Sequence, residues 1–346
     1  MSKTYFEMNN QYEALTKTIE TMGKKKQEII DLYKKSNKGN ITFIGCGSGY
    51  CLCQSGSLSA RVRLGVKSDA FAAGDLLLNY EKYSKAIDDS LFIVPSRSGS
   101  TSEVILAINK IREGKSVPII SITCVEGSDL SKISDCVIEL PWAFDESVCQ
   151  TRAVTNLYAA QLLLIAYISG DTKLEESVKL AASIGQEYMS KNESVLKNIA
   201  EQNWENVAIL ADGEMQGIAS EGAMAFVEIA QINASYYHLL DVRHGPMVLV
   251  NGKTLVVMCV QKENFEYQKA LINDIVNRGA TVVVYSDEVI EDMNDKVTVI
   301  NSGVSLDDAV RGIPYIYILQ ALAYFKAEKL GLDIDNPDGI VAWVKL

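Results

Sequence analysis

Short apolar runs alternate along this chain with longer segments in which apolar residues recur every three or four positions. Short runs bounded by turn residues are typical of buried strands, and the longer periodic segments are typical of amphipathic helices. On this pattern we predict strands at residues 41–44, 67–71, 91–95, 117–123, 136–140, 207–210, 254–260, 281–285 and 297–300. We predict helices at residues 4–36, 51–65, 74–79, 102–114, 152–168, 173–203, 217–234, 264–278 and 309–330.

The predicted strands and helices alternate, which favours strand–helix–strand units and therefore parallel sheets in an α/β fold. The pattern restarts after a charged helical connector, at an offset of roughly 165 residues, which is a usual length for one domain. We expect two tandem domains, each a parallel sheet flanked by helices in a flavodoxin- or Rossmann-like three-layer sandwich. The divisions are an amphipathic helical arm at residues 1–37, a first domain at 38–185 and a second at 186–346.

The 346-residue chain has 48% hydrophobic and 22% charged residues and a formal net charge of −11. This balance is that of a globular protein, and the negative charge argues against a nucleic acid or an anionic membrane as a partner. It does not exclude a phosphorylated ligand, because a helix N-terminus binds phosphate locally. No apolar run reaches the length of a membrane-spanning helix, and the first residues lack a signal-peptide core, so we expect a cytoplasmic protein.

Seven cysteines are scattered along the chain, mostly in predicted strands, where cysteine behaves as a small buried hydrophobic residue. There is no paired Cys-x-x-Cys motif, and the two histidines are too few to make a structural zinc site attractive. We therefore expect no disulfide, no metal ion and no cofactor.

Two predicted strand-to-helix turns are rich in glycine and hydroxyl residues: residues 96–101 read SRSGST and residues 45–49 read GCGSG. Hydroxyl groups, a flexible glycine and the free N–H groups of a helix start suit a phosphate at the carboxyl end of a parallel sheet. Alternatively, the hydroxyl groups only cap the helix. Arg97 either adds positive charge to such a site or points into solvent. The turn at 45–49 is a poor dinucleotide motif, and we expect it to let a sugar-sized ligand approach the strand.

Residues 221–246 hold both histidines and two glutamates in an otherwise apolar stretch. Glu221 and Glu228 are two helical turns apart and share one face. Apolar neighbours of Glu228 raise the pKa of its carboxyl, which suits proton transfer, although a thin polar stripe facing water or an arginine is the alternative. His244 precedes a Gly-Pro pair and so lies on a turn, either as a general acid or as a hydrogen-bonded loop histidine. His238 is expected to pack among its apolar neighbours.

Together these motifs resemble the sugar isomerase (SIS) domain proteins. Four short sequences carry the resemblance by their order and spacing: Gly45-Cys-Gly-Ser48, Ser96-x-Ser-Gly-x-Thr101, Glu221-Gly-Ala and Arg243-His-Gly-Pro246. The arrangement is similar to the double-SIS type, which occurs in the isomerase half of glutamine–fructose-6-phosphate transaminase, in amino-sugar-phosphate deaminase/isomerases and in fructosamine-phosphate deglycases. It covers residues 38–346.

The resemblance implies roles for individual residues. It implies that the following residues contact the phosphate and the sugar of the substrate: Ser48, Ser96, Arg97, Ser98, Thr101, Val148, Gln150 and Glu221. Gln150 stands where the family has a serine. Glu228 lies sixteen residues before His244, as the family's proton-shuttling glutamate lies before its histidine. That histidine assists ring opening or protonates a leaving group, and a neighbouring subunit commonly supplies it.

The tail departs from the isomerising members of the family. Those members carry a lysine that handles the open-chain carbonyl, at a position occupied here by Ala342, and Lys345 follows three residues later. The deglycase branch lacks that lysine. The resemblance therefore implies a phosphosugar enzyme that transfers a proton between carbons 1 and 2, as an aldose–ketose isomerase, an amino-sugar-6-phosphate deaminase/isomerase, or alternatively a fructosamine-6-phosphate deglycase.

A non-catalytic sugar-phosphate sensor is the alternative from a different class. Such regulators usually pair SIS domains with a DNA-binding module, and the first 37 residues are too few for a helix-turn-helix domain. The expected partners are a small phosphosugar and further copies of this chain, as a homodimer or higher homo-oligomer with His244 donated across the interface. The apolar helices at 152–168 and 309–330 are candidates for that interface.

Overall fold

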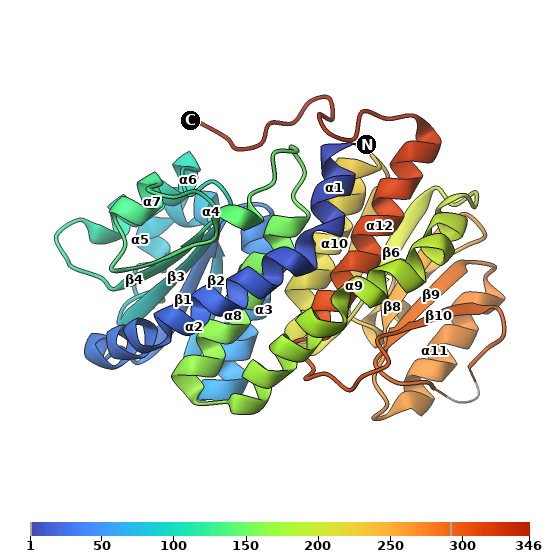
Figure 1. Cartoon of the computed structure of the whole chain (residues 1–346), viewed down its shortest axis with the longest axis horizontal. Coiled ribbons are helices and arrows are strands. Elements are labelled where there is room, and N and C mark those ends of the chain that lie inside the picture. The colour runs from blue at the N-terminus through green and yellow to red at the C-terminus, as the bar shows by residue number, and fades with distance from the viewer. Residues whose placement is uncertain (1, 291–292) are drawn as a thin grey trace.

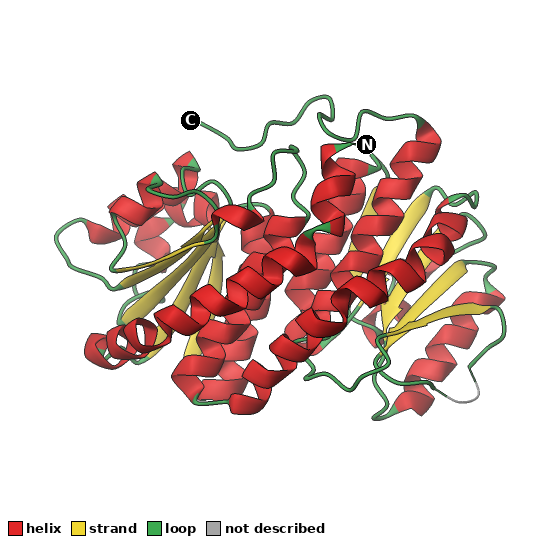
Figure 2. Cartoon of the chain, in the orientation of Figure 1, coloured by secondary structure: helices red, strands yellow, loops and turns green. Residues whose placement is uncertain are grey.

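The computed structural model describes residues 2–290 and 293–346 of the chain. Within these residues two parallel five-stranded sheets lie on opposite sides of a central group of long helices (Figure 1; Figure 2). The prediction of an α/β fold with parallel sheets flanked by helices is confirmed.

The first sheet has the strand order β2-β1-β3-β4-β5, and all of its pairings are parallel. Its strands are β1 (Asn40–Gly45), β2 (Lys67–Ala72), β3 (Ser90–Ser96), β4 (Ile119–Thr123) and β5 (Cys136–Glu139). Each lies close to the residues where a strand is predicted. The apolar runs of β1, β3 and β4 are continuous rather than alternating because helices cover both faces of the sheet at these inner strands.

Side chains of β3 show how the two faces are used. Leu91 and Ile93 belong to the core between the two sheets, whereas Phe92 and Val94 pack in a second cluster with residues of α6 (Ser102–Arg112). The other helices of this half are α3 (Ser48–Leu64), α4 (Ala73–Leu78), α5 (Tyr80–Tyr83), α7 (Asp129–Lys132) and α8 (Arg152–Ser169), with a 3₁₀ turn, η1, at Pro141–Ala143.

The N-terminal arm is helical as predicted, but it forms two helices, α1 (Lys3–Asn9) and α2 (Gln11–Ser36). The prediction of one helix over residues 4–36 missed the break at Asn10. Leu15, Met22 and Ile29 on α2 are fully buried. The arm therefore packs along α8 and is part of the compact molecule (Figure 1).

The second sheet has the order β10-β9-β8-β6-β7 and is also parallel throughout. Its strands are β6 (Asn206–Leu210), β7 (Asn233–Tyr237), β8 (Thr254–Cys259), β9 (Thr281–Ser286) and β10 (Val297–Asn301). In chain order this is the topology of the first sheet, with the second strand at one edge and the third, fourth and fifth strands following in sequence.

One strand of this sheet, β7, was not predicted. The helix expected at 217–234 is α10 (Gln216–Ile229), and it ends where Gln231 adopts a left-handed backbone with φ +53°. β7 follows at once as an edge strand beside β6. Its side chains are exposed or only partly buried, so the strand leaves no apolar run in the sequence.

Long helices join and cover the second sheet. They are α9 (Thr172–Ala200), α10, α11 (Phe265–Asn277) and α12 (Gly312–Leu330), with the 3₁₀ turns η2 (Gly213–Met215), η3 (Leu240–Arg243) and η4 (Pro246–Leu249). The charged connector at 173–203 is α9. The boundary expected after residue 185 falls inside this uninterrupted helix, which packs against both α8 and α12.

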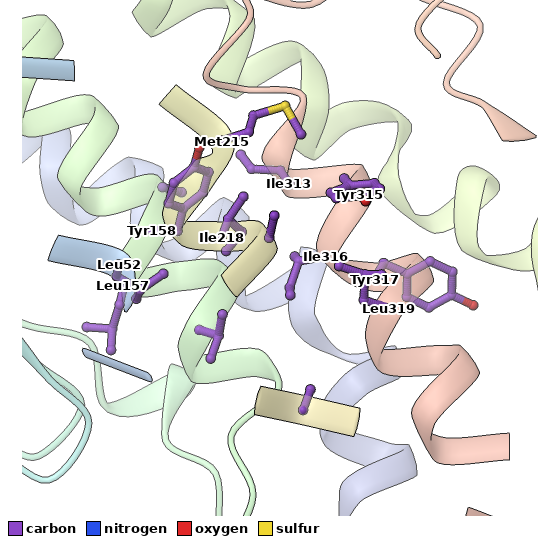
Figure 3. Packing of buried hydrophobic residues seen from close by; sticks show 14 of the residues in the cluster. Leu52, Leu157, Tyr158, Met215, Ile218, Ile313, Tyr315, Ile316, Tyr317 and Leu319 are labelled. Carbon is purple, nitrogen blue, oxygen red and sulfur yellow. The ribbon is translucent and has the colours of Figure 1, made fainter. Parts of the chain in front are cut away.

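The main core lies between the two sheets. Figure 3 shows Tyr158 of α8, Ile218 of α10 and Ile313 of α12 converging there with residues of α3. Nearly all side chains of α8 and α12 are buried within the chain itself. The expectation that these two helices supply an interface between subunits is therefore wrong, because their apolar surfaces already pack inside one chain.

None of the described helices combines the length and the hydropathy that a membrane-spanning segment needs. The seven cysteines are free thiols, and all but Cys46 are buried. The expectation that most cysteines lie in strands is wrong, because only Cys136 and Cys259 do, while Cys51 and Cys53 are buried in α3.

Candidate functional site

The first sheet reverses its strand order between β1 and β3, because the chain leaves β1 toward one edge and continues from β3 toward the other. In open parallel sheets, ligands bind outside the carboxyl ends of the strands at such a switch point. A cavity of about 420 Å³ lies there. Its walls are the turns after β1 and β3, the loop at 148–150, one residue of α10 and the tail at 339–344.

Most of the residues that the sequence singles out line this cavity. They are Ser48, Ser96, Arg97, Ser98, Thr101, Val148, Gln150 and Glu228. They come from four separate parts of the chain, so the fold assembles them. Glu221 and His244, which the structure also describes, are not among the lining residues.

The turn at 96–101 is organised by its own hydroxyl groups. Ser96 Oγ accepts a hydrogen bond from Gly99 N at 3.1 Å, and Ser98 Oγ accepts one from Ser100 N at 3.2 Å. Thr101 is the N-cap residue of α6, yet its side chain makes no capping hydrogen bond. Helix capping therefore does not account for this hydroxyl, which faces the cavity with Ser98.

Gly99 is required by the shape of this turn. Its φ is +59°, in the left-handed region, and a Cβ atom would lie 2.2 Å from Ser128 Oγ. Its carbonyl oxygen accepts a hydrogen bond of 2.8 Å from Leu130 N. The turn is thus clamped against the segment after β4, and a side chain at residue 99 would displace it.

The close crossing of α10 over α3 brings the glutamates to the cavity. At Gly217 a Cβ atom would lie 2.0 Å from the carbonyl oxygen of Cys51, so only glycine permits this approach. Glu221 is then buried at hydrogen-bond distance from Ser48, and Glu228 reaches the cavity two turns further along.

Both carboxyl groups are withdrawn from water. Burial raises the pKa of Glu221 well above its ordinary value, and the neighbouring charge of Glu228 raises it further, while the Ser48 hydroxyl opposes the shift. Glu221 Oε2 has no hydrogen-bond partner among the described residues. Burial also raises the pKa of Glu228, opposed by the Arg97 guanidinium and by a hydrogen bond with Cys149. A carboxylate of this kind is a stronger base than one in water.

Arg97 does not point into solvent, and its guanidinium is held by backbone carbonyls. It donates to Ser147 O at 2.8 Å, to Asp145 O at 3.5 Å and to Ala342 O at 2.6 Å. Its Nε is buried and without a partner among the described residues. Arg97 therefore fastens a loop and the tail to the turn while it lines the cavity.

The two histidines lie elsewhere. His244 ends η3 and is exposed, and its backbone N–H donates to Asp241 O at 2.8 Å. His238 was expected to pack, which is wrong: its side chain is half exposed, and its Nδ1 lies 2.9 Å from Asp212 Oδ1. A polar partner after β6 holds this ring at the surface, which local apolar neighbours could not reveal.

The tail forms one wall of the cavity. Figure 1 shows it running from the end of α12 back toward α6. Val344 O accepts a hydrogen bond from Ser102 N at 3.4 Å, and Leu346 N donates to Ser102 Oγ at 3.1 Å. Ala342 lines the cavity, whereas Lys345 is exposed and is not among the lining residues.

Two further residues at the site escaped the sequence reasoning. Glu103 lines the cavity, and its buried Oε2 has no partner among the described residues. Its position in the first turn of a helix after a hydroxyl-rich turn is the signal that was available. Cys149, which contacts Glu228, lies between Val148 and Gln150 and carried no signal beyond that neighbourhood.

A larger cavity, about 730 Å³, lies at the carboxyl ends of β8 and β9. Its buried cation, Arg311, is already bonded to Asp287 Oδ1 at 3.1 Å and to Val260 O. Several carboxylates line it, and the switch point of this sheet is between β6 and β8 instead. The candidate site is therefore the smaller cavity. Among the described residues, no three His, Cys, Asp or Glu side chains are grouped as metal ligands.

Comparison with known proteins shows what this chain is similar to. Residues 35–168 match the SIS domain family. The chain is 25% identical over 350 residues to glutamine–fructose-6-phosphate aminotransferase of Haemophilus influenzae, covering 96% of this chain and 57% of that protein. It is 26% identical over 323 residues to a probable enzyme of the same name from Schizosaccharomyces pombe, covering 90% and 45%. The chain thus spans about half the length of these relatives.

Solved structures of the same fold cover the whole chain. The structure described as glucosamine-6-phosphate deaminase from Thermotoga maritima has a TM-score of 0.81 and 26% identity, and 100% of each chain is covered. Tagatose-6-phosphate ketose/aldose isomerase from Escherichia coli has a TM-score of 0.86 at 20% identity, covering 98% of this chain and 96% of that chain. At 20% identity, the similarity to the Escherichia coli structure shows only a shared fold.

Proposed function

We propose that this chain, which carries a SIS domain over residues 35–168, is a phosphosugar enzyme that transfers a proton between carbons 1 and 2 of an open-chain sugar 6-phosphate. One observation carries the proposal: a hydroxyl-rich turn at a helix start and the desolvated carboxyl of Glu228 face the same cavity. The turn suits a phosphate and the carboxyl suits a base, and the cavity that they share is large enough for a hexose phosphate.

The phosphate end consists of the turn at 96–101 and the start of α6. Hydroxyl groups of Ser98 and Thr101 donate to phosphate oxygens, and the helix start adds N–H groups and its dipole. Ser48 and Gln150 contact the sugar from the opposite walls. Arg97 holds the loop before Gln150 and the tail through its bonds to Ser147 O and Ala342 O, and it contributes positive charge at the cavity wall.

The chemistry is enolisation beside a carbonyl. Glu228 removes the proton from carbon 2, the electron pair of that C–H bond forms the C1–C2 double bond, and the carbonyl oxygen takes a proton from a general acid. Return of the proton from Glu228 to carbon 1, with loss of the hydroxyl proton on carbon 2 to the conjugate base of the general acid, gives the ketose. With an amino group on carbon 2 the same transfer gives an imine, which water hydrolyses to the ketose and ammonia.

We assign the general acid to His244 of a second copy of the chain. The lining residues of one chain include no imidazole, and His244 is exposed on its own surface. Exposed apolar side chains, Leu240, Val248 and Leu249, lie on the 3₁₀ turns that flank it. A homodimer, or a larger oligomer of copies, would cover these side chains and complete the site.

The second sheet repeats the strand order of the first, and we propose that it forms a second SIS domain that supplies Glu228 and His244. A cytoplasmic location goes with such an enzyme of phosphorylated intermediates.

A second candidate function is a fructosamine-6-phosphate deglycase, which hydrolyses the substrate to a sugar phosphate and an amine. It is favoured by one observation at the tail. The position of the lysine found in isomerising relatives is Ala342, its carbonyl is bonded to Arg97, and Lys345 is outside the cavity. A reaction that needs only Glu228 and an imidazole fits this site.

The test is incubation of the purified chain with a panel of phosphosugars, followed by chromatographic separation of isomers with mass spectrometry, and by ammonia detection. The panel contains glucosamine 6-phosphate, galactosamine 6-phosphate, fructose 6-phosphate, tagatose 6-phosphate and fructosamine 6-phosphates of several amino acids. Ammonia from an amino-sugar phosphate supports the deaminase, and a free amino acid from a fructosamine phosphate supports the deglycase. Binding without turnover across the panel would mean a sugar-phosphate sensor and would overturn the proposal.

A further inference from the structure

A carboxylate from the first helix of the chain contacts the loop at residues 145–150, which lines the cavity. Glu7 of α1 is 2% exposed, and its partner Ser147 lies 140 residues further along the sequence. Its carboxylate accepts hydrogen bonds from Glu146 N at 2.5 Å and from the N–H and hydroxyl of Ser147. An isolated buried carboxylate is costly, so these donors are what makes its position tenable.

The loop that Glu7 holds is the one that lines the cavity with Val148 and Gln150. Ser147 connects the two sides: its hydroxyl, whose single proton is shared between Glu7 and Cys149 O at 2.9 Å, faces the loop, and its carbonyl accepts the bond from Arg97. The peptide at Ser147 is therefore gripped by Glu7 from behind and by Arg97 from the cavity side.

The same helix also holds the tail. Asp335 accepts hydrogen bonds from Lys3 N at 2.9 Å, from Thr4 N at 2.9 Å and from Thr4 Oγ1 at 2.8 Å. The backbone oxygen of Asp335 accepts a bond of 3.1 Å from Val148 N. Helix α1, the loop and the base of the tail thus form one hydrogen-bonded unit behind two walls of the cavity.

We propose that Glu7 is a positioning residue of the phosphosugar site: it fixes the loop at 145–150 so that Val148 and Gln150 meet the sugar. This inference rests on the proposed function and adds a part of the chain that lies outside the matched SIS domain. Packing of α1 against the rest of the chain would need only apolar contacts, whereas Glu7 accepts hydrogen bonds from backbone N–H groups of the loop. Loss of the carboxylate should therefore weaken binding and leave the proton transfer intact.

The experiment compares Glu7→Gln, Ser147→Ala and the double variant with the unmodified chain. The amide of Glu7→Gln keeps one acceptor, and Ser147→Ala removes only the hydroxyl donor. In each single variant we expect KM for the turned-over phosphosugar to rise about tenfold, while kcat stays within about threefold of the unmodified chain. In the double variant KM should rise less than a hundredfold, because the two groups share one hydrogen bond. The matched control is Glu146→Gln, which changes an exposed carboxylate of the same loop and should leave KM unchanged.

Hydrogen–deuterium exchange of the unliganded variants gives a readout that does not depend on turnover. Glu7→Gln and Ser147→Ala should increase exchange within residues 144–151 and leave β4 protected. Unchanged exchange in this loop would overturn the proposal, as would faster exchange with an unchanged KM, or loss of protection throughout α1 and α2. If the unmodified chain turns over nothing, the proposed function fails; its affinity for fructose 6-phosphate, measured by calorimetry, then replaces KM, and equal affinity in Glu7→Gln overturns the positioning role.

Discussion

Glu221 and Glu228 lie two turns apart on α10, and the charge on Glu228 is one of the causes that raise the pKa of Glu221. The two carboxyl groups differ in what surrounds them. Glu221 is fully enclosed beside Ser48, whereas Glu228 lines the cavity and contacts Cys149. Of the two, only Glu228 lines the cavity, and Glu221 lies behind it as a neutral acid wherever the pH is below its raised pKa.

Replacement of the proposed base is the most direct prediction. Glu228→Gln keeps the size and polarity of the side chain but removes the base, so kcat should fall by about 10²–10⁴-fold. Steady-state turnover of the active phosphosugar measures this, with calorimetry to verify that the substrate still binds. Glu205→Gln, which changes an exposed carboxylate paired with Lys253, is the control. Wild-type turnover by a folded Glu228→Gln protein would exclude the mechanism.

The pH profile should report the environment of Glu228. Because burial raises its pKa, activity should be lost as the pH falls through a value above that of a free glutamate. The hydrogen bond with Cys149 lowers this pKa. Cys149→Ala should therefore move the acidic limb of kcat/KM to higher pH, while Cys136→Ala, far from the cavity, should not. A limb that stays in place in Cys149→Ala would show that the thiol does not act on the base.

Asp145 should make stability depend on pH. It is buried, and burial together with the charge of Glu7 raises its pKa to about 7. The folded state therefore binds a proton that the unfolded state releases, and this contribution to stability is lost as the pH rises from about 4 to about 7. Asp145→Asn should remove this pH dependence. The free energy of unfolding of the variant should therefore increase relative to that of wild type as the pH rises across this range. Urea unfolding at several pH values measures this, and Asp88→Asn, at the surface, should show no such trend.

Gly99 should be intolerant of a side chain. In Gly99→Ala the methyl group would meet Ser128 Oγ in a left-handed backbone, so both stability and phosphosugar affinity should fall, stability by about 1–3 kcal/mol or more. Gly114→Ala is the matched control, because Gly114 also has a positive φ, +74°, but faces open space. Equal losses in the two variants would mean that the contact with Ser128 is unimportant.

Subunit mixing tests the assignment of His244. If each site takes Glu228 from one copy and His244 from another, the Glu228→Gln and His244→Ala proteins are inactive alone. Their equal mixture after subunit exchange should regain about a quarter of wild-type activity, because half of the dimers are mixed and each has one intact site. No recovery after verified exchange would place both groups in one chain or remove His244 from the chemistry.

The sequence alone identified what local rules control. The apolar runs, the two turns at 45–49 and 96–101 and the spacing of Glu228 before His244 can all be read within short windows, and the structure has strands and turns at those places. Parallel sheets followed from the alternation of strands and helices. Where a strand lacked an apolar run, as in β7, the same rules failed, because an edge strand with exposed side chains resembles the end of the preceding helix.

The tertiary structure alone decided which distant residues meet. Nothing in the sequence near Arg97 indicates that its guanidinium bonds Ala342 of the tail, and nothing near Glu7 indicates the loop at Ser147. These contacts join residues more than a hundred positions apart, and they depend on how α1, α10 and the tail pack around the first sheet. Local patterns record the period and the turns of the backbone; the partners of a buried polar group are set by the packing that removes it from water.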